Sequence, residues 1–127
     1  MSFLGKCLAP IYTGLAFSRF AHEKYEDAAR FLEKAIQLDP KTGRMEFIYS
    51  CLGRSYLALG RENDALETLA TTYEIFHDKG LTFKGTSELR QYYEFLKAYS
   101  SVLHKVGQIE RATEIAHEAK EIESKLH

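Results

Sequence analysis

The feature that most constrains this chain is a pair of small residues, spaced twelve positions apart, that occurs three times along the sequence. The three pairs are Ala16 and Ala28, Gly53 and Ala65, and Ser100 and Ala112. Around each pair, apolar residues recur at intervals of three and four, which places them on one face of a helix. Self-similarity of this kind predicts stacked structural repeats, because a single unit cannot bury its apolar face alone.

Helical periodicity dominates, and no segment alternates for long enough to indicate a strand. We predict six helices, over residues 9–21, 25–38, 44–58, 62–78, 87–105 and 109–126. The first range begins at residue 9 because Pro10 suits the first turn of a helix, where a missing N–H costs little. Gly60, Gly80 and Gly107 follow predicted helices and favour the left-handed backbone that closes a helix end. The six helices should therefore pair as three antiparallel hairpins.

The second hairpin carries the most informative pattern, Tyr49, Leu52, Gly53 and Tyr56 followed by Ala65 and Leu69. This pattern resembles the tetratricopeptide repeat, W-x2-L-G-x2-Y, then A-x3-F, then P, on about 34 residues. The first hairpin offers Tyr12, Leu15 and Ala16, then Ala28, Leu32, Ala35 and Pro40, and the third offers Leu96, Tyr99 and Ser100, then Ala112, Ala116 and Ala119. The resemblance implies an all-α, right-handed superhelical stack of three antiparallel helix-turn-helix repeats.

The repeats would cover residues 9–42, 46–79 and 93–126 of one domain spanning 9–126. The resemblance implies that the first helix of each repeat lines a concave groove. The residues predicted to bind a partner are the apolar Phe17, Phe20, Phe47 and Leu57, and the basic or polar Arg54, Lys97, Ser101, His104 and Lys105. We expect a peptide with an apolar part and an acidic end to bind there. In the alternative, the N-terminal segment 1–8 caps the groove and covers Phe17 and Phe20.

Composition excludes several classes of function. The chain has 127 residues and a formal net charge of −1, which disfavours an obligatory nucleic-acid binder. No apolar run approaches the roughly 20 residues that span a bilayer, so no membrane insertion is expected. The N-terminus lacks the pattern of a secretory signal, and Cys7 and Cys51 are the only cysteines, which together indicate a cytoplasmic location.

Catalytic chemistry has weak support in the sequence. Two E-x-x-H motifs, Glu74 to His77 and Glu114 to His117, are the kind that builds a di-iron carboxylate site. They fall at different positions in the repeat and should not converge, and no nucleophile motif or phosphate-binding loop is present. We therefore predict a non-enzymatic protein-interaction scaffold without metal or cofactor. A structural, self-associating subunit is the alternative, and a helical metalloenzyme is a third.

Overall fold

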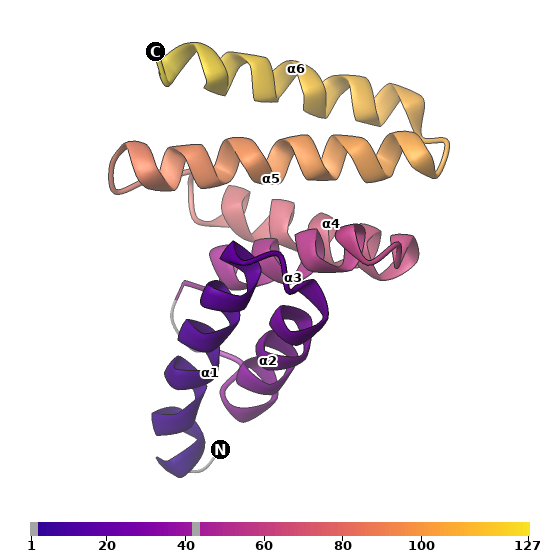
Figure 1. Ribbon diagram of the computed structural model, residues 1–127. Helices are drawn as coiled ribbons and strands as arrows, with labels where there is room; N and C mark the ends of the chain where they lie inside the picture. Colours follow the sequence, from indigo (N-terminus) through magenta and orange to yellow (C-terminus); the bar gives the residue numbers. More distant parts are fainter. Residues whose placement is uncertain (1–2, 42–43) are drawn as a thin grey trace.

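The computed structural model describes residues 3–41 and 44–127 of the chain. Within them lie six helices, α1 (Phe3–Ala21), α2 (Tyr25–Leu38), α3 (Met45–Ala58), α4 (Glu62–Asp78), α5 (Thr86–Lys105) and α6 (Ile109–Lys125), and no strand. Consecutive helices pack as pairs, and the pairs stack in layers so that the two termini lie at opposite ends of the molecule (Figure 1). The predicted all-α stack of hairpins is confirmed. Five of the six predicted helices agree with the structure to within one residue at each end.

Helix α1 is the exception, because it begins at Phe3 and not at residue 9. Pro10 therefore lies inside the helix, where proline usually costs about 3 kcal/mol. Gly5, Ala9 and Ala16 are the buried residues of α1, and they lie on one face of the helix, which packs against α2. Packing along this face continues the helix through Pro10. Residues 3–8 are thus the first turns of α1 and not a separate segment folded over the groove.

Within the second hairpin, α3 and α4 approach closely at Gly53. In the repeat pattern, Gly53 is the small residue paired with Ala65, twelve positions later. The side-chain atoms nearest to a Cβ at this position belong instead to Leu69 and Thr68, one turn further along α4. Gly53 and Leu69 are both buried, so the contact lies in the core of the hairpin. A small residue is therefore required at position 53, and its nearest neighbour is a large aliphatic side chain.

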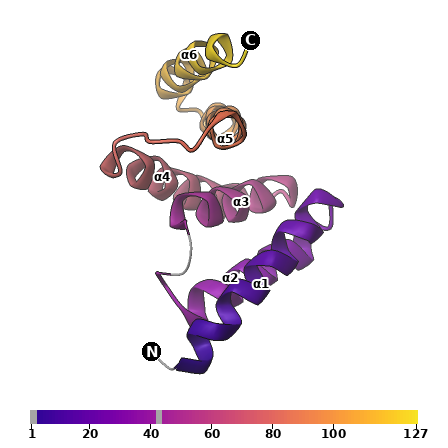
Figure 2. The same ribbon diagram turned by 90° about the vertical axis from the view of Figure 1, so that its left-hand side faces the viewer.

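Aromatic side chains form the layer between the second and third hairpins. Phe76 of α4 lies 4.7 Å from Tyr92 and 5.3 Å from Phe95 of α5, measured between ring centroids. Tyr73 of α4 lies 5.7 Å from Tyr99 in the same layer. Edge-to-face and offset contacts of this kind stabilise beyond the area that they bury. The aromatic layer therefore fixes α5 on the preceding hairpin. Figure 2 shows the ribbon of α5 nearly end-on, next to α3 and α4.

The turns within the second and third hairpins have the left-handed glycines that the sequence predicts at helix ends. Gly60 has a φ of 78° and Gly107 a φ of 88°, both in the left-handed region. Beyond Gly60, the N–H of Arg61 donates to the carbonyl oxygen of Tyr56 at 2.9 Å, which closes the end of α3. Each glycine therefore ends the first helix of a hairpin and allows the second helix to run back along it.

Candidate functional site

A hollow of about 430 Å³ opens where the first helices of all three hairpins meet. We call it the groove pocket. Its walls are Phe17, Phe20 and Ala21 from α1, Phe47, Cys51 and Arg54 from α3, and Glu88 and Gln91 from α5. Because each hairpin contributes only its first helix, this lining agrees with the concave groove that the repeat pattern predicts. Four of the nine predicted binding residues therefore lie together, namely Phe17, Phe20, Phe47 and Arg54.

The three phenylalanine rings of the groove pocket are not equally constrained. Phe20 packs edge-on against Tyr25 with 5.3 Å between centroids, and Phe47 packs edge-on against Phe76 at 5.4 Å. Phe17 remains 42% exposed, although it is a large apolar side chain. Two rings therefore form fixed apolar walls, while the third presents its surface to solvent.

Arg54 brings a positive charge to these apolar walls. Its guanidinium lies 4.8 Å from the centroid of the Phe20 ring, and Nη1 donates to Oε1 of Gln91 at 3.3 Å. Among the described residues, no carboxylate forms an ion pair with it. The ring contact and the hydrogen bond fix the orientation of the guanidinium and leave its charge available to a ligand.

The α5 wall of the groove pocket carries an acid whose charge is already compensated. Nη1 of Arg44 lies 3.0 Å from Oε2 of Glu88, and the backbone N–H of Lys84 donates to Oε1 of the same carboxylate at 2.7 Å. Cys51 forms part of the floor, and burial raises the pKa of its thiol to about 12. The thiol is therefore neutral at physiological pH, and it acts as an apolar wall and not as a nucleophile.

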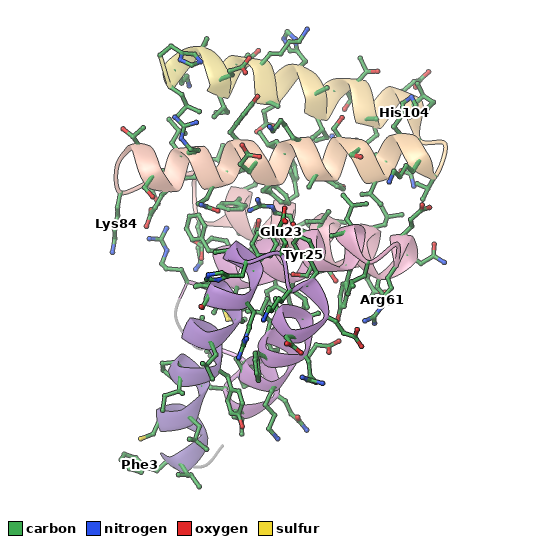
Figure 3. The ribbon with its side chains drawn as sticks, viewed as in Figure 1. Phe3, Glu23, Tyr25, Arg61, Lys84 and His104 are labelled. Atoms are coloured by element: carbon green, nitrogen blue, oxygen red, sulfur yellow. The ribbon has the colours of Figure 1, made fainter. Side chains whose placement is uncertain are left out.

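The remaining predicted residues lie elsewhere. Lys97, Ser101, His104 and Lys105 line a second hollow of about 560 Å³ between α5 and α6, together with Ser100, Ala116 and Lys120 among others. Gln91 and Lys97 are six residues apart, a rotation of about 240° around the helix, so they face different sides of α5. His104 also lies near the end of α5 that is opposite to Lys84 (Figure 3). Leu57 lines neither hollow and is half-buried against the core.

The sequence did not predict the contribution of Glu88 and Gln91 to the groove pocket. Helix α5 is 20 residues long, whereas α3 has 14, and these two side chains lie in its first two turns. The repeat pattern begins further along α5, so alignment of the three hairpins assigned the groove residues of α5 from Lys97 onward. Two features of the sequence indicated that the third hairpin differs from the others, namely the length of its first helix and the 47-residue step from Ala65 to Ala112. Neither feature shows which side chains of that helix face the groove.

The two E-x-x-H motifs do not converge. His77 stacks on Tyr73 with 4.2 Å between centroids, and its Nε2 lies 4.0 Å from a carboxylate oxygen of Glu118. His117 pairs instead with Glu121 on the exposed face of α6, at 3.0 Å. Within residues 3–41 and 44–127, no group of three or more histidine, cysteine, aspartate or glutamate side chains has an arrangement that could hold a metal ion.

Three helical hairpins stacked around a groove define a helical-repeat protein. Residues 9–42 match the family model described as tetratricopeptide repeat, over the same range that the sequence predicted for the first repeat. Together with six helices packed in pairs, this match confirms the resemblance to tetratricopeptide repeats. A comparison with curated proteins finds no match. In the part of the chain that the structure describes, no helix has the length and apolar character needed to cross a membrane.

Proposed function

We propose that this chain is a non-enzymatic scaffold that binds a peptide segment of a partner protein in the groove pocket. Tetratricopeptide repeats generally mediate protein interactions, which supports the broader class. The observation that carries the specific proposal is the exposed Phe17 ring in the same hollow as the Arg54 guanidinium, which has no carboxylate partner among the described residues. An apolar surface beside an available charge is the usual composition of a ligand site.

The walls indicate the chemistry of the peptide. The rings of Phe17, Phe20 and Phe47 suit one bulky apolar side chain, which would be buried between helices from different hairpins. Arg54 suits a carboxylate next to that anchor, because a guanidinium forms paired hydrogen bonds with carboxylates. The proposed ligand is therefore a short segment in which an apolar residue adjoins an aspartate, a glutamate or a terminal carboxylate.

Selection from a peptide-display library against the whole chain tests this proposal, because it requires no choice of partner. We expect the enriched sequences to share a bulky apolar residue with an acid beside it. Synthetic peptides from the selection should then bind the variants Phe17→Ser and Arg54→Gln at least about tenfold more weakly, which corresponds to about 1.4 kcal/mol. Binding would be measured by calorimetric titration.

Ile109→Ser is the matched control, because Ile109 is 48% exposed on α6 and lies outside both hollows. This variant should bind the selected peptides as the parent does. Thermal unfolding of each variant verifies that its fold is intact. If the selected peptides bind the Phe17 and Arg54 variants with unchanged affinity, the groove pocket is not the binding site. If those two variants bind normally and Lys97→Gln binds the peptides more weakly, the binding site is the hollow between α5 and α6.

A further inference from the structure

Exposed apolar side chains concentrate on α1. Among the described residues, seven large apolar side chains are exposed, and five of them belong to this helix: Phe3, Leu4, Ile11, Leu15 and Phe17. Phe17 belongs to the groove pocket, and Phe3 projects from the free end of α1, away from α2 (Figure 3). The others, with the half-buried Leu8, follow the spacing 4, 8, 11 and 15 along one side of the helix. We call Leu4, Leu8, Ile11 and Leu15 the α1 stripe.

The internal repeat shows what this side of the helix does elsewhere in the chain. Ile11 corresponds to Ile48 in the second hairpin and to Phe95 in the third, and its exposed fraction is 57%, against 2% and 0% for those two residues. Leu15 corresponds to Leu52 and Tyr99, and it is 42% exposed, against 5% and 6%. The equivalent positions are therefore core positions of a contact between hairpins.

The third hairpin shows which surface covers these positions. Phe95 lies 5.3 Å from Phe76, and Tyr99 lies 5.7 Å from Tyr73, between ring centroids. Both partners are on α4, the second helix of the preceding hairpin. In the first hairpin the same side of α1 has no described helix against it, and α1 lies at the outer edge of the stack (Figure 1). The α1 stripe thus has the composition of an interface between hairpins but no partner among the described helices.

We propose that the α1 stripe binds the same stripe of a second copy of this chain, in a two-fold symmetric pair of antiparallel α1 helices. The spacing 4, 8, 11 and 15 is the alternation of four and three that lines the seam between two packed helices. In the antiparallel arrangement Leu4 meets Leu15 of the other copy, and Leu8 meets Ile11. Such a contact closes on itself, as two-fold interfaces do.

The opposite end of the stack is a poor match for the α1 stripe, which favours the two-fold pair over a head-to-tail assembly. On α4, Tyr73 and Phe76 cover the next hairpin, and the corresponding residues of α6 are Lys120 and Glu123. Pairing α6 with the α1 stripe would place these charges against Leu and Ile side chains, where they would lose water without gaining a partner. Between Leu4 and Leu15 the one charged residue is Lys6, which lies on the far side of the helix. Arg19 lies one turn beyond Leu15 and so falls outside the paired positions.

The size of the contact sets its expected strength. Four side chains from each copy bury less than most stable complexes, whose interfaces begin at about 1,200 Å² in total. The dimer should therefore be reversible and depend on concentration. The groove pocket opens on another side of α1, so a dimer would leave it accessible. Loss of peptide binding and loss of the dimer are separate outcomes, and either proposal can fail without the other.

Sedimentation equilibrium of the whole chain, from about 1 μM to several hundred μM, tests the inference. We expect a monomer–dimer equilibrium that the double variant Ile11→Glu, Leu15→Glu shifts to monomer. Both positions are exposed, so the variant should unfold at the parent temperature, and Leu4→Glu in the first turn of α1 provides a second, milder variant. Ile109→Glu, which replaces an exposed apolar residue on α6, should leave the dimer intact. A parent that stays monomeric throughout, or a dimer that survives both stripe variants, would overturn the proposal.

Discussion

Gly53 lies directly beneath the side chain of Leu69, and the two residues set how closely α3 and α4 approach. A Cβ at position 53 would lie 2.5 Å from Cδ2 and 2.7 Å from Cγ of Leu69. Contacts below 3.0 Å are essentially never made by real Cβ atoms, so any larger residue must displace Leu69. Gly14, by contrast, lies in α1 with nothing within 4 Å of its Cβ position. Gly53 and Gly14 therefore give a matched pair of substitutions.

Gly53→Ala should lower the free energy of unfolding by about 1–3 kcal/mol, because overpacking of a buried contact exceeds the gain in helix propensity. Gly14→Ala should raise it by up to about 1 kcal/mol, because alanine favours the helix and meets no obstacle. Urea unfolding followed by circular dichroism measures both changes. If Gly53→Ala also raises the free energy of unfolding, the contact between Gly53 and Leu69 does not limit how closely α3 and α4 pack.

Glu118 of α6 connects three helices, because Tyr73 of α4 and Tyr92 of α5 both donate hydroxyl hydrogen bonds to its carboxylate. Burial, with the hydrogen bond to Glu118, raises the pKa of Tyr92, whose side chain is 0% exposed. Tyr92→Phe should lower the free energy of unfolding by about 1.5–3 kcal/mol, as expected for a hydrogen bond to a charged group.

Tyr93→Phe is the control for that change, because Tyr93 makes the same kind of bond to Glu123 at 2.8 Å on the exposed side of α5. A surface change of this type should stay within about 0.5 kcal/mol. Chemical unfolding of the two variants side by side gives the comparison. Equal effects would mean that the buried bond to Glu118 does not hold α5 and α6 together.

The two cysteines should differ sharply in reactivity. Cys7 is exposed, whereas Cys51 is 6% exposed and burial raises the pKa of its thiol to about 12. At pH 8 only about one Cys51 thiol in ten thousand is then ionised, and the thiolate is the reactive form. A chromogenic disulfide reagent should therefore titrate one thiol quickly in the folded chain and a second only after urea is added. Cys7→Ser should abolish the fast phase, and a fast phase that persists would contradict the burial of Cys51.

Glu46 should make the fold sensitive to acid. Its side chain is 2% exposed, with Nζ of Lys79 at 3.0 Å and Nε of Arg44 at 3.4 Å. Burial alone would raise the pKa of this carboxyl, but hydrogen bonds from its own backbone and from Lys79, with the charges of Lys79 and Arg44, hold the pKa below its ordinary value of 4.5.

Because the folded pKa lies below the unfolded one, the stabilisation by Glu46 is present above about pH 4.5 and is lost as the pH falls through the lowered value. Glu46→Gln should therefore be less stable than the parent at pH 7, and it should lose less stability on acidification. Thermal unfolding from pH 7 to pH 3 measures the difference. Glu67→Gln, at an exposed position on α4, should follow the parent curve. If Glu46→Gln and the parent lose the same stability between pH 7 and pH 3, the lowered pKa of Glu46 does not contribute to the acid sensitivity of the fold.

The groove pocket shows how far the repeat pattern can be used to predict a site. Phe17, Phe20, Phe47 and Arg54 were predicted because their positions within each repeat place them on the first helix of a hairpin, facing inward. Lys97 and His104 were assigned to the same groove by the same rule, yet they line the hollow between α5 and α6. The rule fails on α5 because this helix is longer than α3, so its first turns and not its middle reach the groove.

Local sequence determined the pairing of the helices and all of their ends except the start of α1, because these depend on periodicity and on a few turn glycines whose effects extend over only a few residues. The tertiary structure alone decided three other features. It continued α1 through Pro10, because Gly5 and Ala9 are buried on the face of α1 that packs against α2. It placed Leu69 over Gly53. It also joined Glu46 to Lys79 and Glu118 to Tyr73, pairs that lie 33 and 45 residues apart in the chain. Such contacts depend on how helices pack against each other, within a hairpin and between neighbouring hairpins, and the periodicity of a single helix does not encode that packing.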